Sequence, residues 1–140
     1  MTKQERPHEA DEKRPVDPAQ LARARALAAA AYDRQAEDVV ALDVHGLTSL
    51  ADTFLIASGR SRQQVRAIAD AVLEAARRDG IRSLGAEGTS EGRWALLDFG
   101  SVIFHVFHEE ARRHYDLERL WADAPQLDVE PLELKQRKAK

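Results

Sequence analysis

The stretch TFLIASGRSRQQVRAIADAVLEAARRDG, residues 53–80, contains the clearest strand and helix patterns of this 140-residue chain. Its first part, residues 53–57, is a short apolar run of the kind that forms a buried strand. Ser61 then begins a capping box with Gln64, and apolar residues recur at helical spacing until Gly80 ends the pattern. The sequence therefore predicts a buried strand that leads directly into an amphipathic helix.

Upstream of this unit the patterns predict one more helix and one more strand. Asp17 supplies an N-cap and Pro18 a suitable first helical residue, so a helix is expected from there to about Gln35. Residues 39–44 form an apolar run that Gly46 ends, which predicts a second buried strand. A short helix is expected between the two strands.

Downstream, the chain alternates again between strand and helix patterns. We expect strands at 81–86, 94–99 and 102–107 and a last helix at 109–122. Gly100 and Ser101 separate the second and third of these strands, which predicts a hairpin. The whole order predicts an α/β (α+β) fold, in which a single mixed β-sheet packs with helices in one domain of about 105 residues.

The two ends of the chain differ from its middle. Residues 1–16 combine four basic and four acidic side chains with two prolines, so we expect a disordered arm there. Residues 125–140 are expected to form a flexible tail, which leaves 17–124 as the folded domain. The longest apolar run, residues 26–32, is far shorter than the ~20 residues of a membrane span. The absence of cysteine excludes disulfides and thiolate chemistry, and it fits a cytoplasmic protein.

Charge argues against a protein held mainly by nucleic acid. The net charge of the chain is −3, and all five lysines lie in the two flanks. Residues 17–124 contain 13 arginines and 17 acidic residues, a net charge of −4. A protein that binds phosphate backbones carries the opposite balance, so RNA phosphate is not expected to be the main partner.

A search for catalytic, cofactor or metal sites finds no complete pattern. The five histidines are scattered, and the turn from Ser58 to Ser61 lacks the glycines and the lysine of a phosphate-binding loop. Asp43, Asp52 and Asp98 each lie near a strand end, but nothing in their spacing requires them to meet. We therefore predict no catalytic residue, no cofactor and no metal ion.

Aromatic residues favour a binding protein instead. Trp94, Tyr115 and Trp121 are three of the four Trp and Tyr residues, and they are interleaved with arginines and acids in the last third of the chain. Such residues dominate protein interfaces because they bury a large area and keep a polar group. For Trp121, whose spacing to neighbouring leucines is helical, an ordinary core position is an equally good explanation.

Five segments together carry a family resemblance: ADTFLIASG (51–59), residues 61–70, WALLDFG (94–100), HVF (105–107) and YDLERLW (115–121). This combination closely resembles the ribosomal silencing factor (RsfS, or Iojap-like) family from about Leu21 to Trp121. The chain departs from many members at Gln64, where they have histidine, and at Ser101, where aspartate is common.

The resemblance implies a function and a fold. It implies a non-enzymatic cytoplasmic factor that binds the large ribosomal subunit through its ribosomal protein fourteen, blocks the small subunit and represses translation when nutrients are scarce. It also implies a nucleotidyltransferase-like topology without the catalytic carboxylates, and little direct RNA contact. By matching position, the partner-binding residues would be Trp94, Asp98, His105, Arg112, Tyr115, Leu117, Glu118 and Trp121.

Two other classes of function remain open from the sequence. One is a small nucleotidyltransferase-like enzyme that uses the turn at 58–61, and the other is a homodimeric adaptor built on the apolar hairpin. A homodimer of the free protein is also compatible with silencing.

Overall fold

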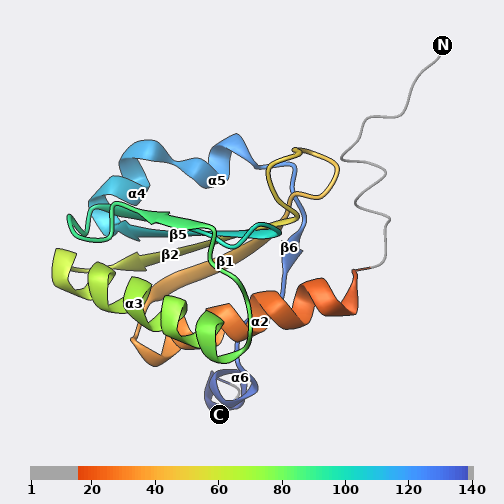
Figure 1. Cartoon of the computed structure of the whole chain (residues 1–140), viewed down its shortest axis with the longest axis horizontal. Helices are drawn as coiled ribbons and strands as arrows, with labels where there is room; N and C mark the ends of the chain where they lie inside the picture. Colours follow the sequence, from red (N-terminus) through yellow and green to blue (C-terminus); the bar gives the residue numbers. More distant parts are fainter. Residues whose placement is uncertain (1–15, 139–140) are drawn as a thin grey trace.

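The structure is a computed structural model that describes residues 16–138 (Figure 1). Its helices are α2 (Pro18–Asp33), α3 (Arg62–Arg78), α4 (Glu109–Tyr115), α5 (Leu117–Leu120) and α6 (Leu132–Lys138). Its strands are β1 (Glu37–Asp43), β2 (Thr53–Gly59), β3 (Gly85–Glu87), β4 (Trp94–Asp98), β5 (Val102–His108) and β6 (Gln126–Leu127). None of the helices in the described part of the chain is both long enough and apolar enough to cross a membrane.

The strands form one mixed sheet in the order β3-β4-β5-β2-β1-β6. β2 and β5 run parallel, and every other neighbouring pair runs antiparallel. A parallel pair requires a crossover, so the chain leaves β2 through α3, β3 and β4 before it returns beside β2 as β5. All seven residues of β2 are buried, which makes this strand the centre of the fold.

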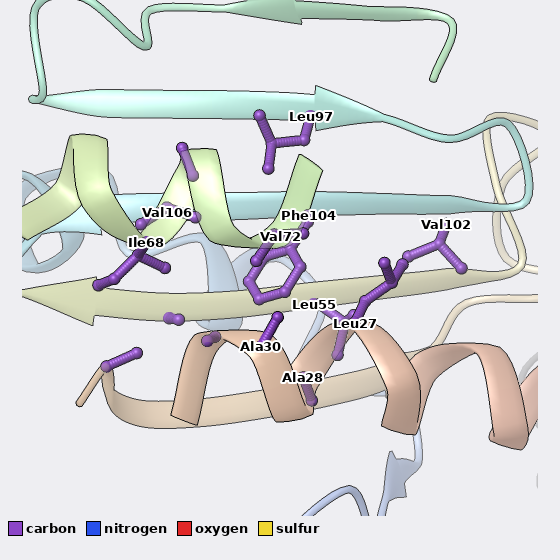
Figure 2. Close-up of a cluster of buried hydrophobic side chains, with 14 of the residues drawn as sticks. Leu27, Ala28, Ala30, Leu55, Ile68, Val72, Leu97, Val102, Phe104 and Val106 are labelled. Carbon is purple, nitrogen blue, oxygen red and sulfur yellow. The ribbon is translucent and has the colours of Figure 1, made fainter. Parts of the chain in front are cut away.

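Helices α2 and α3 cover one face of the sheet (Figure 1). Figure 2 shows the core between these two helices and the sheet, where side chains from both helices meet those of the central strands. Leu27 of α2, Ile68 and Val72 of α3, and Leu55 and Phe104 of the sheet are fully buried. Burial of each such side chain stabilises the fold by about 1.5–3 kcal/mol. Most of the buried apolar residues belong to this layer.

The opposite face of the sheet has a smaller cover. Helices α4 and α5 lie over it, and the loop between β1 and β2 rises on the same side (Figure 1). A second apolar cluster forms there around Phe54, Ile56 and Phe107, with Trp94, Leu117 and Trp121 packed against it. This face contains the candidate functional site.

Several sequence predictions are confirmed at the level of single contacts. The Asp17 carboxylate accepts the backbone N–H of Ala19 at 3.0 Å, and the Ser61 hydroxyl accepts that of Gln64 at 3.0 Å. The reciprocal half of the capping box differs from the prediction, because the Gln64 side chain accepts the N–H of Arg60, and not that of Ser61, at 2.7 Å. Gln64 also donates to the carbonyls of Arg34 and Gln35 after α2. The mixed sheet and the hairpin of β4 with β5 are also as predicted.

Two predicted elements are wrong, and a third is displaced, since the strand expected at 81–86 is β3 at 85–87. The expected helix over 109–122 is two short helices, because Asp116 adopts a left-handed conformation (φ 49°, ψ 53°) between α4 and α5. The expected short helix between β1 and β2 is a series of turns, in which His45 and Thr48 form an isolated bridge.

The predicted flexible tail, 125–140, is also wrong for most of its length. Gln126 and Leu127 add β6 to the edge of β1, and Leu127 and Val129 are buried in the helix-covered core. Helix α6 follows, and Lys135 pairs with Asp128. The predicted disordered arm, 1–16, lies outside the described residues except for Val16.

Shortening the chain tests the structural role of β6. A chain that ends at Ala124 should lose about 3 kcal/mol of unfolding free energy, because it lacks the buried Leu127 and Val129. A chain that ends at Pro131 keeps both residues and should lose less than half as much. Urea unfolding followed by circular dichroism measures both values. Equal stability of the Ala124 chain and the full chain would show that β6 contributes nothing.

Candidate partner-binding face

The candidate site depends on how the chain turns between α4 and α5. Asp116 begins α5 in a new direction, and its backbone N–H donates to the Arg112 carbonyl at 2.9 Å. The Arg112 guanidinium then donates to both carboxylate oxygens of Glu118, at 2.6 and 3.3 Å. It also donates to the Ser58 hydroxyl of β2 at 2.8 Å. One buried arginine therefore ties α5 to α4 and to the centre of the sheet.

A stack of aromatic rings lies beside this junction. The Trp94 ring of β4 stacks on Phe107 with centroids 4.9 Å apart and contacts Tyr115 at 4.7 Å. The Arg93 guanidinium lies 5.8 Å from the centroid of the Tyr115 ring, within the range of a cation–π interaction. The stack fixes Tyr115, whose residue surface is 46% exposed, as a rigid aromatic group on the outside of the protein.

His105 lies beneath the aromatic stack and is 6% exposed. Its Nδ1 accepts the indole N–H of Trp94 at 3.2 Å, while its Nε2 is buried without a hydrogen-bond partner among the described residues. Burial lowers the pKa of His105 from 6.5 to about 4, so the ring is neutral at physiological pH. The Nδ1 atom acts as the acceptor, and a neutral imidazole then carries its proton on Nε2.

Apolar residues extend the face along α5. The Trp121 ring meets Phe54 of β2 edge to face, with centroids 5.2 Å apart. Leu120 points outward and is 74% exposed, and Leu50, in the loop after β1, is 67% exposed. Large exposed leucines beside half-buried aromatic residues are typical of a protein-binding surface.

The eight predicted partner-binding residues differ in exposure. Tyr115 is exposed; Trp94, Asp98, Leu117, Glu118 and Trp121 are half-buried; and His105 and Arg112 are buried. Seven of the eight surround the α4–α5 junction and the aromatic stack. Asp98 lies apart, because it is about 13 Å along β4 from Trp94 and its carboxylate accepts the Gly100 N–H in the hairpin turn. His105 and Arg112 are positioned to support the surface rather than to form it.

Sequence reasoning missed the two exposed leucines. Leu117, Leu120 and Trp121 are spaced i, i+3, i+4, so the sequence pattern places Leu120 on the same buried helix face as the other two. That prediction is wrong for Leu120, which is 74% exposed, because α5 is only four residues long. Leu50 lies in a loop without periodicity, so the sequence contains no signal for its exposure.

The other chemistry-bearing residues have structural partners. Ser58 accepts from Arg112, and a Cβ on Gly59 would lie 3.0 Å from Val65, so the turn at 58–61 is packed tightly against α3. Asp43 and Asp52 are joined through Gln20, which donates to the Asp43 carboxylate and to the Asp52 carbonyl. The described residues contain no group of three or more His, Asp or Glu side chains arranged to hold a metal ion.

Comparison with known proteins identifies the family. The family model described as "Ribosomal silencing factor during starvation" matches residues 17–140. The chain belongs to this ribosomal silencing factor family. Among curated proteins, it is 48% identical over 103 residues to "Ribosomal silencing factor RsfS" of Bacillus subtilis, covering 74% of this chain and 87% of that protein. It is also 33% identical to "Protein Iojap, chloroplastic" of Arabidopsis thaliana, over 81% of this chain and 47% of that longer protein.

Solved structures agree with this membership of the silencing factor family. A crystal structure from Bacillus halodurans is 40% identical with a TM-score of 0.67, and it covers 74% of this chain and 94% of that chain. A crystal structure from Chromobacterium violaceum is 33% identical with a TM-score of 0.71, over 76% and 88% of the two chains. The family places this protein among ribosome-related regulators of translation, and the observed sheet confirms the predicted α+β fold.

The buried His105 predicts a pH-dependent stability. The pKa of His105 is lower in the folded state than in the unfolded state, so the unfolded chain binds more protons below pH 6.5. The free energy of unfolding therefore decreases as the pH falls from 6.5 towards 4. Urea unfolding of the wild type and of His105→Gln should be compared at pH 7.0 and pH 4.5. The difference in unfolding free energy between the wild type and the variant should change by about 2.5 kcal/mol from pH 7.0 to pH 4.5, in favour of the variant. An unchanged difference would contradict a neutral, buried His105.

Proposed function

We propose that this protein binds the large ribosomal subunit through its ribosomal protein fourteen. Its bulk then blocks association with the small subunit and represses translation under nutrient limitation. The partner-binding face of α4, α5 and the aromatic stack forms the contact. The protein acts in the cytoplasm, where the ribosomal subunits meet.

The exposed Tyr115, held against Trp94, is the single observation that supports this face most strongly. A rigid aromatic side chain buries a large area on binding and loses little conformational entropy, because its position is already fixed. Leu120 of α5 and Leu50 of the loop between β1 and β2 add exposed apolar area on the same side of the sheet. The family name supports the ribosome as the partner, since relatives in the family are described as ribosomal silencing factors.

The charge of the protein supports a protein partner over RNA. Residues 17–124 have a net charge of −4, which suits a basic ribosomal protein and disfavours close approach to phosphates. The proposed mechanism is steric and stoichiometric, so it requires no catalytic residue and no cofactor. An interface of standard size, about 1,200–2,000 Å² in total, is sufficient for stable occupancy.

Reassociation of separated ribosomal subunits tests the proposed function. With excess purified protein, the subunits should remain separate on a sucrose gradient, and the protein should migrate with the large subunit at about one copy per particle. Full reassociation, with the protein left at the top of the gradient, would contradict the proposal.

Tyr115→Ala tests the proposed surface. Loss of the central aromatic ring should weaken binding to large subunits by about thirtyfold, equivalent to about 2 kcal/mol. Arg78→Ala is the matched control, because Arg78 is exposed at the end of α3 on the opposite side of the sheet. Both variants must first unfold in urea at the wild-type midpoint. Equal binding by the two variants would show that the contact lies elsewhere.

A further inference from the structure

The outer edge of β1 is only partly covered. β6 pairs with Ala41 and Leu42, and the Asp43 N–H donates to the Pro125 carbonyl at 2.8 Å. No residue of β6 reaches the first half of β1, because β6 ends at Leu127. The residues before Ala41 therefore present an unpaired strand edge within the part of the chain that the structure describes.

A bulge interrupts the regular pairing of the same segment of β1 with β2. On the side of β2, Glu37 pairs with Ser58 and Val40 with Ile56, so Asp38 and Val39 fall between the paired positions. Asp38 adopts a left-handed conformation with φ 52°. Backbone groups alternate in direction along a strand, and Asp43 directs its N–H towards β6. Val39 is therefore the next residue in line whose backbone groups face the uncovered side.

A hollow lies on each side of the unpaired segment. The first, of about 490 Å³, is lined by Tyr32, Val39, Ala41 and residues 126–130. The second, of about 640 Å³, is lined by Val40, Ser58 and residues of α4 and the α4–α5 junction. Asp38, Val39 and Val40 line both. An added strand directs its side chains alternately to the two faces of a sheet, so successive side chains would enter the two hollows in turn.

The lining of the hollows is acidic. Seven acidic residues line them, against two arginines. Three of the seven are already paired: Glu37 with Arg60, Glu118 with Arg112 and Asp128 with Lys135. Within residues 16–138, Asp38, Glu109 and Asp116 form no ion pair. A second copy of this chain would bring the same acidic surface to the edge, so the charge favours a basic partner over self-association.

We propose that the unpaired edge of β1 at Asp38 and Val39 binds an extended basic segment of a partner protein by strand addition. The partner backbone pairs with Val39, and its arginine or lysine side chains occupy the acidic hollows. The second hollow shares Arg112 and Glu118 with the partner-binding face, whereas Asp38 and Val39 lie outside that face. The inference does not depend on the proposed ribosomal function, because the edge exists in the isolated protein.

A short labelled peptide tests the proposal on the full-length chain. The probe is a six-residue peptide of alternating arginine and valine, measured by fluorescence anisotropy. It should bind at least tenfold more tightly than the same peptide with glutamate in place of arginine. It should also bind at least tenfold more tightly than a version with methylated backbone amides, which cannot pair with a strand. On binding, hydrogen exchange at the Val39 amide should slow.

Two matched variants locate the site. Asp38→Asn removes one charge and keeps a residue that tolerates the left-handed conformation, and it should weaken binding of the arginine peptide about threefold to fivefold. Asp70→Asn removes one exposed charge on α3 and should leave binding unchanged. Equal effects of the two variants would overturn the proposal, because they would indicate attraction by net charge alone. Equal binding of the methylated peptide would also overturn it.

Two other occupants of the edge give distinct results. If the edge takes a second copy of the chain, sedimentation will show a dimer that the arginine peptide dissociates. If it takes the basic C-terminal end of the same chain, a chain that ends at Pro131 will bind the peptide at least tenfold more tightly than the full chain. Either result would overturn an external basic segment as the occupant.

Discussion

The pairing of β2 with its two neighbours is the constraint on which the rest of the structure depends. All seven residues of β2 are buried, and the strand runs antiparallel to β1 and parallel to β5. The parallel pair requires a crossover, and the amphipathic α3 provides it on one face of the sheet. Once α2 and α3 occupy that face, the chain after β5 is left to cover the other, and α4 and α5 do so.

The second face depends on a buried polar junction. A four-residue helix such as α5 is not stable alone, because the first turn costs more conformational freedom than its hydrogen bonds return. Arg112 stabilises α5 by donating hydrogen bonds to Glu118 of α5 and to Ser58 of β2. The Trp121 ring, which follows α5, packs on Phe54. Arg112 is buried but Glu118 is half-buried, so breaking this pair costs less than breaking a fully buried pair, which costs about 3–5 kcal/mol. The junction thereby orients the outer surface of α4 and α5 without a large core beneath it.

The sequence predicted the elements whose signals are local, and it missed those created by tertiary contacts. Capping residues and helical spacing located α3, because both signals lie within one segment. Asp116 interrupts an otherwise helical pattern with a left-handed turn, and Arg112 meets Glu118 across the break. The two-residue β6 is too short for any periodicity, and it forms because β1 offers it an edge. For the candidate site, the aromatic residues were predicted by type, whereas the burial of His105 and the exposure of Leu120 depend on packing.

We propose that α4, α5 and the adjoining ends of the sheet form the docking face for the large ribosomal subunit. Hydrogen exchange measured by mass spectrometry, with and without purified large subunits, locates the docking face. Docking there predicts slower exchange in peptides that cover residues 93–97 and 109–121, with no change in α2 or α3. Slower exchange confined to α2 and α3, with residues 109–121 unchanged, would contradict it.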